Sequence, residues 1–266
     1  MITVLIPSRG RPELARRCRD TWNRTRRMAT TKIRFYLNDD DPHLQHYKAL
    51  INREEYTVGP DQATCFSWNQ MAHAAISRGD QYLMLVGDDA QFLTEGWDQK
   101  IVDFFDNYQH KDKILYVCPR DTTSKEQKKW KFLAHAVSKT GSVKIFNRTP
   151  LQITKFPAKV GCAHFVLHRN WVQTLGYFLP PQFWHWCIDS WLTKLAIRLG
   201  RCYVLPNVEI QSKKLTNDDT GSRLRSRFNI SERDKYTWTV TKQRYMKSDQ
   251  EALQQFIDNY PDNSKS

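Results

Sequence analysis

The sequence predicts an α/β fold in which a mostly parallel β-sheet carries helices on both faces. Short apolar runs alternate with helical patterns through about the first 120 residues, and such alternation is typical of parallel sheets. The 266 residues are 40% hydrophobic, which is enough for a sizeable core, and 26% charged, which predicts long solvated faces. Disorder of the whole chain is therefore not expected.

Five short apolar runs in the first half predict buried strands, and two sets of apolar residues at helical spacing between them predict helices. A glycine, Gly79, is placed to end the first helix. The expected strands are Ile2–Ile6, Ile33–Leu37, Tyr56–Val58, Tyr82–Val86 and Ile114–Cys118. The helical sets are Trp68, Met71, Ala72, Ala75 and Ile76, and then Trp97, Ile101, Phe104, Phe105 and Tyr108.

The second half is less regular. Residues 121–131 predict a mobile polar loop, and Gln211–Arg227 predicts a basic segment that is flexible without ligand. Helical character returns near Asp249–Tyr260. Between these stretches we expect strands at Cys162–Leu167 and Tyr203–Leu205, and a helix with the stripe Ile188, Trp191, Leu192, Leu195 and Leu199 that ends at Gly200.

The chain is strongly basic, with 41 Lys and Arg against 28 Asp and Glu and a formal net charge of +13. Such a surplus favours a polyanionic partner, namely nucleic acid, an anionic membrane or phosphorylated substrates; the alternative is that the charge only maintains solubility. The cations form three clusters: Arg9, Arg11, Arg16, Arg17, Arg19, Arg24, Arg26 and Arg27; Lys125, Lys128, Lys129 and Lys131; and Lys213, Lys214, Arg223, Arg225 and Arg227.

Cysteine usage predicts a reducing compartment. The six cysteines form no C-x-x-C pair, and most lie in apolar runs, so we expect buried free thiols rather than disulfides or a zinc site. No stretch approaches the roughly 20 apolar residues that span a bilayer. We therefore expect a cytoplasmic protein (in the host cytoplasm, if it is viral) without membrane insertion. The oligomeric state stays open.

Three loops follow predicted strands, at the sheet edge where α/β proteins bind ligands. Pro7–Arg11 is basic, whereas Asn38–Pro42 and Gly87–Ala90 are acidic, and together they suit a metal ion with a diphosphate. Adjacent carboxylates such as Asp88 and Asp89 repel each other unless a cation or solvent screens them. Mg²⁺ on a nucleotide takes one or two protein carboxylates. The alternative is a solvated turn that caps the next segment.

Four segments, in this order, read ITVLIPSRGRPE, IRFYLNDDDP, SWNQMAHAAISRGDQYLMLVGDDAQFLTEGW and GCAHFVLHRNWVQTLGYFLPPQFWHWCIDSWLTKLAIRLG. Together they resemble the family-2-like inverting glycosyltransferases of the GT-A fold. The resemblance covers residues 1–210 and implies a Rossmann-like GT-A sheet with a nucleotide-sugar-binding half, 1–120, and an acceptor half, 121–210. Residues 211–266 would form a basic C-terminal extension packed on this domain.

The resemblance also implies a nucleotide-sugar donor, with a UDP-sugar favoured, and a Mn or Mg ion held at Asp88 and Asp89, of which Asp89 is the favoured direct ligand. Two features depart from the family pattern. Gly87 stands where many relatives have a first Asp, and Glu209–Ser212 lacks the metal-binding His that often follows the late strand. The residues that would line the donor are Pro7, Ser8, Arg9, Arg11, Asp39, Asn69, Asp88 and Asp89.

Asp189 matches the acidic residue that opens a helix and acts as the base in inverting relatives. Sugar transfer builds positive charge on the ring and negative charge on the leaving diphosphate. The attacking hydroxyl must also lose a proton, which a carboxylate on the opposite face of the sugar accepts. The alternative role for Asp189 is charge compensation at a helix N-terminus.

The acceptor is expected to be a hydroxyl on a modified DNA base, as in DNA-modifying viral (bacteriophage) enzymes. A donor diphosphate needs one basic cluster, and the chain has three. Trp184 and Trp186 would stack on the exposed base, or else belong to the core. The alternatives are a glycan, lipid-linked or protein acceptor, a nucleotidyltransferase, and a non-catalytic nucleic-acid-binding protein. The predicted nucleic-acid contacts are Lys128, Lys129, Lys213, Lys214, Arg223 and Arg225.

Overall fold

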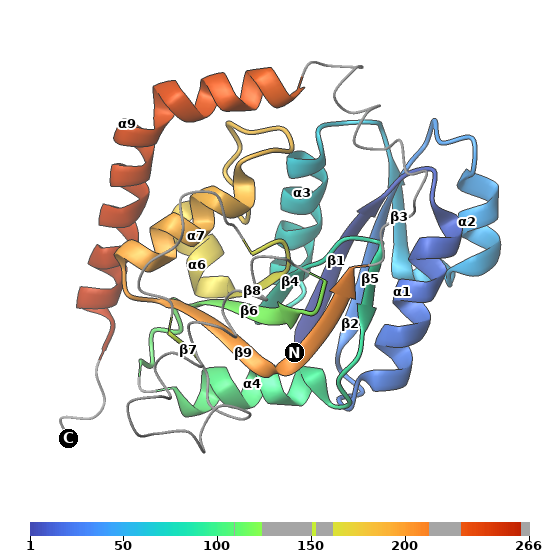
Figure 1. The fold of residues 1–266 in the computed structure, drawn as a ribbon, viewed down its shortest axis with the longest axis horizontal. Coiled ribbons are helices and arrows are strands. Elements are labelled where there is room, and N and C mark those ends of the chain that lie inside the picture. The colour runs from blue at the N-terminus through green and yellow to red at the C-terminus, as the bar shows by residue number, and fades with distance from the viewer. Residues whose placement is uncertain (109, 124–150, 153–161, 213–229, 262–266) are drawn as a thin grey trace.

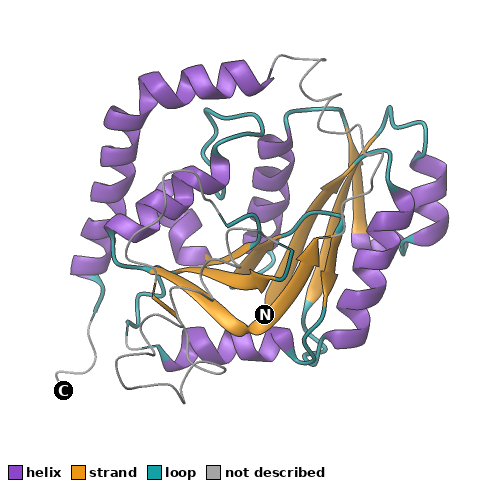
Figure 2. Ribbon diagram, viewed as in Figure 1, coloured by secondary structure: helices purple, strands orange, loops and turns teal. Residues whose placement is uncertain are grey.

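The structure, a computed structural model, describes residues 1–108, 110–123, 151–152, 162–212 and 230–261. These residues form a β-sheet with helices on both faces, as the sequence predicts (Figure 1, Figure 2). Almost all of the two stretches predicted to be mobile or flexible lies outside the described residues. None of the described helices has a segment long and apolar enough to cross a membrane.

The described strands pair in the order β3–β2–β1–β4–β8–β6–β9–β5, and β7 pairs with β9 beside this path. All seven predicted strands are confirmed, as β1–β4, β6, β8 and β9. The strands are β1 (Ile2–Ser8), β2 (Lys32–Asn38), β3 (Tyr56–Gly59), β4 (Tyr82–Leu85), β5 (Ala90–Phe92), β6 (Tyr116–Asp121), β7 (Leu151–Gln152), β8 (Phe165–His168) and β9 (Cys202–Ser212).

Strand direction decides which residues share an edge of the sheet. Strands β3, β2, β1 and β4 are all parallel, and β6 is parallel to β9. Strand β8 runs antiparallel between β4 and β6, so β6 and β9 point the same way as β4. The carboxyl ends of these six strands therefore lie at one edge, together with the amino end of β8.

Alternating side chains of the strands build two cores. On β1, Ile2, Val4 and Ile6 face the core covered by α1 (Pro12–Thr25), α2 (Leu44–Leu50) and α4 (Trp97–Asn107). Leu5 faces the opposite core, which the remaining helices cover. These are α3 (Thr64–Ser77), α6 (Arg169–Leu175), α7 (Ile188–Arg198) and α9 (Ile230–Asn259), and a short 3₁₀ turn, η1 (Arg53–Glu55), precedes β3.

The predicted helices are confirmed, but α9 is much longer than the expected Asp249–Tyr260 segment and contains 30 residues. Its first half has low intrinsic helix propensity because of several Thr and aromatic residues, so packing must supply the stability. The ribbon bends (Figure 1). Thr239 and Thr241 donate hydrogen bonds of 3.0 and 2.6 Å to the carbonyls of Lys235 and Thr237, a pattern that bends helices.

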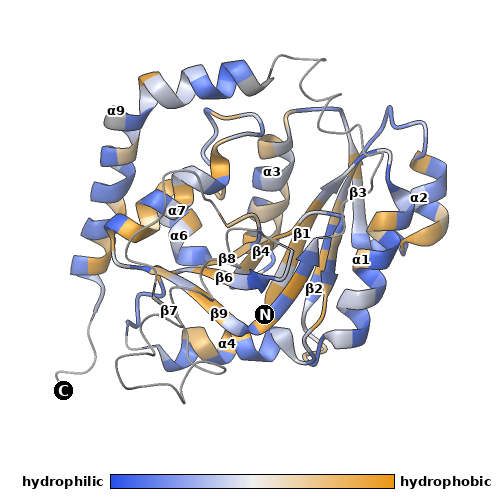
Figure 3. Cartoon of the chain, in the orientation of Figure 1, coloured by the Kyte–Doolittle hydropathy of each residue, from blue (hydrophilic) through white to orange (hydrophobic). Residues whose placement is uncertain are grey.

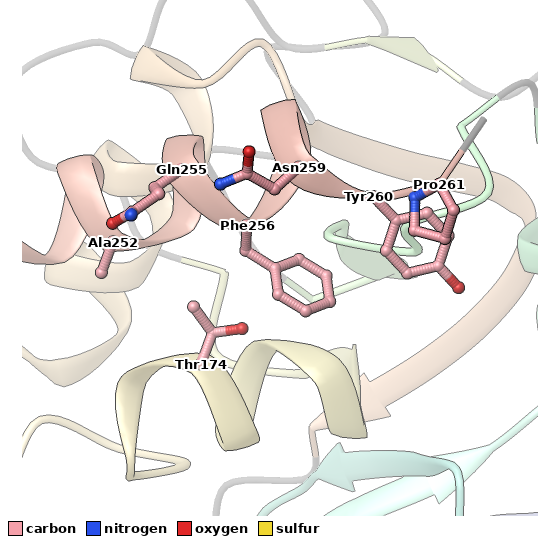
Figure 4. A pocket seen from close by; sticks show the side chains of 7 residues that line it. All are labelled: Thr174, Ala252, Gln255, Phe256, Asn259, Tyr260 and Pro261. Atoms are coloured by element: carbon pink, nitrogen blue, oxygen red, sulfur yellow. The ribbon is translucent and has the colours of Figure 1, made fainter.

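Helix α9 is largely hydrophilic (Figure 3) yet is anchored to α6 and α7 by a few buried residues. Met246 and Leu253 are fully buried. The carboxylate of Asp249 accepts hydrogen bonds from the Tyr177 hydroxyl and, at 3.0 Å, from the Trp191 indole. Beyond this anchor, Thr174 faces the end of α9 across an open groove of about 530 Å³ (Figure 4).

Candidate functional site

The candidate site lies at the sheet edge that collects the carboxyl ends of the strands. Ser8 ends β1, and Asp88 follows the neighbouring strand β4. The Ser8 hydroxyl donates a 2.5 Å hydrogen bond to the Asp88 carboxylate. The structure therefore brings the predicted basic first loop and the predicted acidic motif into direct contact.

Asp88 is buried and tied to the first loop. The Nε of Arg11 donates to one carboxylate oxygen at 3.1 Å, and a terminal guanidinium nitrogen lies 2.6 Å from the other. Burial raises the pKa of Asp88 to about 6, although the charge of Arg11 and the hydrogen bond from Ser8 oppose this rise. Both carboxylate oxygens thus face the protein.

The rest of the first loop is held by residues after β2. The Gly10 amide donates to Asp41 at 2.7 Å, and the Arg11 amide donates to the Tyr47 hydroxyl at 2.8 Å. The guanidinium of Arg9 forms an exposed bidentate ion pair with Asp40. Since its backbone is fixed at several points, the loop is preorganised, with Arg9 on its outer side.

Asp39 and Asp61 lie at the ends of β2 and β3. Asp39 is exposed, and its amide donates to the Gly59 carbonyl at 2.8 Å. The Asn38 side chain donates to Asp61 at 3.2 Å. Burial raises the pKa of Tyr36, and the charges of Asp39 and Asp61 add to this rise, so both carboxylates lie near that ring. Asp61 is not among the residues that the sequence predicts for this site.

Asn69 is bonded to the protein at both ends of its amide. Its oxygen accepts the amides of Phe178 and Leu179, both at 2.8 Å, and its nitrogen donates to the Leu179 carbonyl at 2.8 Å. These bonds fasten helix α3 to the segment between α6 and α7. The structure thus gives Asn69 contacts that position the backbone, and its predicted contact with the donor stays a prediction.

Asp89 is half-buried beside Gly87. A Cβ atom on Gly87 would lie only 2.6 Å from an Asp89 carboxylate oxygen, so the carboxylate occupies the space that a side chain at position 87 would need. A side chain at position 87 would therefore require the Asp89 carboxylate to move.

Two residues that the sequence analysis did not select, Asp121 and His164, meet near Asp89. The Nε2 atom of His164 lies 2.9 Å from the Ser212 hydroxyl, which donates to Asp121 at 3.3 Å. The buried Nδ1 atom of His164 has no hydrogen-bond partner among the described residues. Burial lowers the pKa of His164, while the charges of Asp121 and Asp89 oppose that shift. Hence a histidine does reach the end of β9, but from the start of β8.

Asp189 lies in the first turn of α7. It is half-buried, and its carboxylate accepts the Ser190 amide at 2.7 Å. Burial raises its pKa. Burial also raises the pKa values of Tyr116 and Cys162, and the charge of Asp189 makes a small contribution to both shifts, so Asp189 lies within electrostatic reach of these two residues.

The segment before α7 carries the predicted stacking residues. Trp184 and Trp186 are half-buried. The guanidinium of Arg233 lies 3.8 Å from the ring centre of Trp184. His185 is within 3.2 Å of the Thr64 hydroxyl, and burial lowers its pKa. This segment, Trp184–Cys187, is called the acceptor loop below, and it lies between α3, α9 and Asp189.

No three His, Cys, Asp or Glu side chains in the described parts of the chain are close enough together to hold a metal ion by themselves. A Mg²⁺ ion on a diphosphate uses only one or two protein carboxylates, because phosphate oxygens and water fill the other positions. Asp89 can supply one of these, and the buried Nδ1 atom of His164 can supply a further ligand. The residues present therefore fit a metal that arrives with its nucleotide.

The predicted cationic clusters differ in their surroundings. In the first cluster, Arg16 pairs with Glu13 and Asp20 at 3.0 Å, and Arg19 pairs with Glu55 at 2.5 Å, so part of its charge is balanced within the protein. The predicted nucleic-acid contacts of the other two clusters lie outside the described residues, namely Lys128, Lys129, Lys213, Lys214, Arg223 and Arg225.

Neither a protein-family model nor a curated protein matches the sequence. The structure is similar to S. aureus TarS 1–349 in complex with UDP-GlcNAc, with a TM-score of 0.57, 11% identity, and coverage of 83% of this chain and 60% of that chain. It is also similar to the mannosyltransferase PcManGT from Pyrobaculum calidifontis in complex with GDP-Man and Mn²⁺, with a TM-score of 0.58, 13% identity, and coverage of 85% and 60%. This chain thus spans 60% of the length of each. The described residues have the GT-A-type α/β fold of glycosyltransferases.

Proposed function

We propose that this protein is an inverting, nucleotide-sugar-dependent glycosyltransferase. One observation carries the proposal: the first loop and Asp88 bond to each other at the carboxyl edge of a GT-A-type sheet. Asp189, in the first turn of α7, is assigned to the same site by the resemblance to inverting glycosyltransferases. Support also comes from the similar solved structures, which contain UDP-GlcNAc and GDP-Man. Because sequence identity to them is 11–13%, the activity itself is inferred from the site.

The donor would lie along the carboxyl ends of β1, β2 and β4. Pro7, Ser8, Arg9 and Arg11 belong to the loop that would cover the nucleotide, and Asp39 would contact the base or ribose. Asp89, with His164 nearby, would hold a Mn or Mg ion. Such an ion neutralises negative charge on the leaving diphosphate. Asp88 would act indirectly, by fixing the first loop in place through its bonds to Ser8 and Arg11.

The transfer step would use Asp189 as general base. The acceptor hydroxyl gives its proton to the Asp189 carboxylate while its oxygen bonds to the anomeric carbon. The bond from that carbon to the diphosphate oxygen breaks, and the configuration inverts. Since burial raises the pKa of Asp189, the carboxylate is a better proton acceptor than an exposed aspartate.

Donor binding tests the proposal most directly. Calorimetry with UDP, GDP and their sugars, with and without Mn²⁺, should show metal-assisted binding that Asp89→Ala weakens by about tenfold or more, since even residues behind the metal ligands cost that much. Asp103→Ala is the matched control, because Asp103 is exposed on α4 and its carboxylate accepts a hydrogen bond from Gln99 of the same helix. Unchanged binding in folded Asp89→Ala protein would remove Asp89 from the metal site.

The proposed acceptor is a hydroxyl on a modified DNA base. The net charge of +13 and the half-buried Trp184 and Trp186 near Asp189 support it. Phosphate contacts would make affinity fall steeply with salt. Each Lys or Arg removed, for example at positions 128, 129, 213 and 214, should lower the slope of log K against log salt by nearly one unit. Anisotropy titrations on duplex and single-stranded DNA at two salt concentrations measure this slope. Transfer to an oligosaccharide, lipid or protein, with DNA binding no tighter than roughly 10⁻⁴ M, would exclude DNA as the acceptor.

A further inference from the structure

Helix α9 reaches into the acceptor loop through one carboxylate. Asp234, near the start of α9, is fully buried. It accepts hydrogen bonds from three consecutive backbone amides, those of Trp184 at 3.0 Å, His185 at 2.9 Å and Trp186 at 2.7 Å. This carboxylate lies about fifty residues later in the sequence than the amides it binds.

The acceptor loop needs these bonds because it is neither helix nor strand. Three successive amides would otherwise be withdrawn from water without a partner, and buried unpaired amides are costly. An ionised carboxylate can accept all three, and charge-assisted bonds are stronger than bonds between neutral groups. On the other side, the Cys65 amide at the head of α3 donates to the Trp184 carbonyl at 3.1 Å. The loop is therefore held between α3 and α9.

The position of the candidate base depends on this loop. Cys187, its last residue, has a left-handed backbone with φ of 68°, which is unusual for a residue other than glycine. Helix α7 begins at the next residue, and Asp189 is the second residue of that helix. Loss of the bonds at residues 184–186 would release the entry to α7 and with it the direction of the Asp189 carboxylate.

We propose that Asp234 is a positioning residue that sets the acceptor loop and, through it, Asp189. Helix α9, which lies beyond the segments that resemble known glycosyltransferases, is then part of the acceptor site. Arg233 also helps to hold the acceptor loop, because its guanidinium lies 3.8 Å from the centre of the Trp184 ring. The effect on catalysis rests on the proposed function, whereas the link from Asp234 to the acceptor loop does not.

Asp249 provides a matched control on the same helix. The Asp249 carboxylate, which is half-buried, also accepts hydrogen bonds from donors outside α9. Its partners are the side chains of Tyr177 and Trp191. Substitution to Asn at either position removes one charge without changing side-chain size. Only the substitution at Asp234 acts directly on the amides of the acceptor loop.

Hydrogen–deuterium exchange of the full chain measures the link without any substrate. In Asp234→Asn, exchange of a peptide spanning residues 183–187 should accelerate by about tenfold, the scale of one lost hydrogen bond to a charged group. In Asp249→Asn the same peptide should exchange within about twofold of the unsubstituted protein, because its hydrogen bonds are intact. Unchanged exchange in Asp234→Asn, or equal acceleration in both variants, would overturn the proposal. If Asp234→Asn does not fold, Asp234→Glu replaces it: its longer side chain misaligns the three bonds but keeps the charge, so exchange of the same peptide should accelerate by less than about tenfold and still by more than in Asp249→Asn, and equal exchange in these two variants would overturn the proposal.

Kinetics then connect the link to function. Asp234→Asn should raise the KM for the acceptor or lower kcat by about tenfold, while the affinity for UDP with Mn²⁺ stays within about twofold. Asp234→Glu should restore part of the lost transfer. Loss of donor affinity equal to the loss of transfer would indicate a general structural defect and contradict the positioning role. A protein that binds no nucleotide would defeat the proposed function and leave the exchange result valid.

Discussion

The proposed donor and acceptor sides of the site are held together in different ways. On the proposed donor side, Ser8 and Arg11 both bond to Asp88 from the neighbouring strand, within the first 90 residues. On the acceptor side, the loop before Asp189 is held by Asp234, a residue of the C-terminal helix. The donor side can therefore form from local βαβ contacts, whereas the acceptor side requires the chain to be folded to its last helix.

The proposed roles of Asp88 and Asp189 show the same contrast. Asp88 has both oxygens engaged by side chains, one of them a cation. The hydrogen bond described for the Asp189 carboxylate comes from the backbone of its own helix. Burial raises both pKa values. The ion pair ties Asp88 to the first loop, whereas Asp189, whose carboxylate is bonded by Ser190 and by its own amide, would take the proton of the substrate.

The largest effect expected from this contrast is on transfer in Asp189→Asn. The variant should bind UDP with Mn²⁺ normally and lose transfer by about 10² to 10⁴-fold, because general-base catalysis contributes on that scale. Single-turnover transfer assays with saturating donor separate the two effects.

Glu209→Gln is the control for this substitution. Glu209 is another carboxylate of the chain, on β9, and its 2.7 Å ion pair with Arg120 leads us to expect near-normal turnover when it is neutralised. If Asp189→Asn transfers at the normal rate, or Glu209→Gln loses transfer as completely, the base has been assigned to the wrong carboxylate.

The second effect is on the pH dependence of stability, through Asp88. Its pKa is raised from 3.8 to about 6, so the folded state retains a proton that the unfolded state releases. This contribution to stability is complete below about pH 4 and is lost as pH rises through about 6. The free energy of unfolding should therefore fall by about 3 kcal/mol over this range on account of Asp88.

Denaturant titrations of Asp88→Asn and the unsubstituted protein at several pH values isolate this contribution. The difference between the two curves should change by about 3 kcal/mol between about pH 4 and pH 7, because Asn cannot titrate. Asp189→Asn should remove a slope of the same sign, since its pKa is also raised. Parallel curves for the unsubstituted protein and Asp88→Asn would show that Asp88 does not titrate in this range.

The strand pattern explains why the donor side could be predicted from sequence. Buried parallel strands appear as continuous apolar runs, and a residue that directly follows such a run, as Asp88 follows Tyr82–Val86, must lie at the ligand-binding edge. The same rule could have selected Asp121, three residues after the predicted strand Ile114–Cys118. The rule does not predict the direction of the Asp88 side chain, because that direction depends on Ser8 and Arg11.

The acceptor side could be predicted only in part. The helical stripe after Asp189 located α7, but nothing in the sequence shows that β8 runs antiparallel and brings His164 to the same edge. Asp234 lies in a Thr-rich segment with weak helical periodicity, so neither α9 at this point nor its bonds to the acceptor loop could be foreseen. These contacts depend on the packing of distant elements.

The smallest effect concerns the exposed counterpart of the buried pair. Arg9 and Asp40 retain side-chain exposures of 34% and 46%, against 20% and 0% for Arg11 and Asp88. Exposed ion pairs contribute at most about 1 kcal/mol, so Asp40→Asn should change the unfolding free energy by less than that.

If Arg9 contacts the donor diphosphate, Asp40 competes with it, and Asp40→Asn should then raise UDP affinity by about twofold. Arg9→Gln should lower UDP affinity. In denaturant titrations, a loss of stability larger than about 1 kcal/mol in Asp40→Asn would mean that the first loop depends on the exposed pair. In calorimetry, unchanged UDP affinity in both variants would place Arg9 outside the donor site.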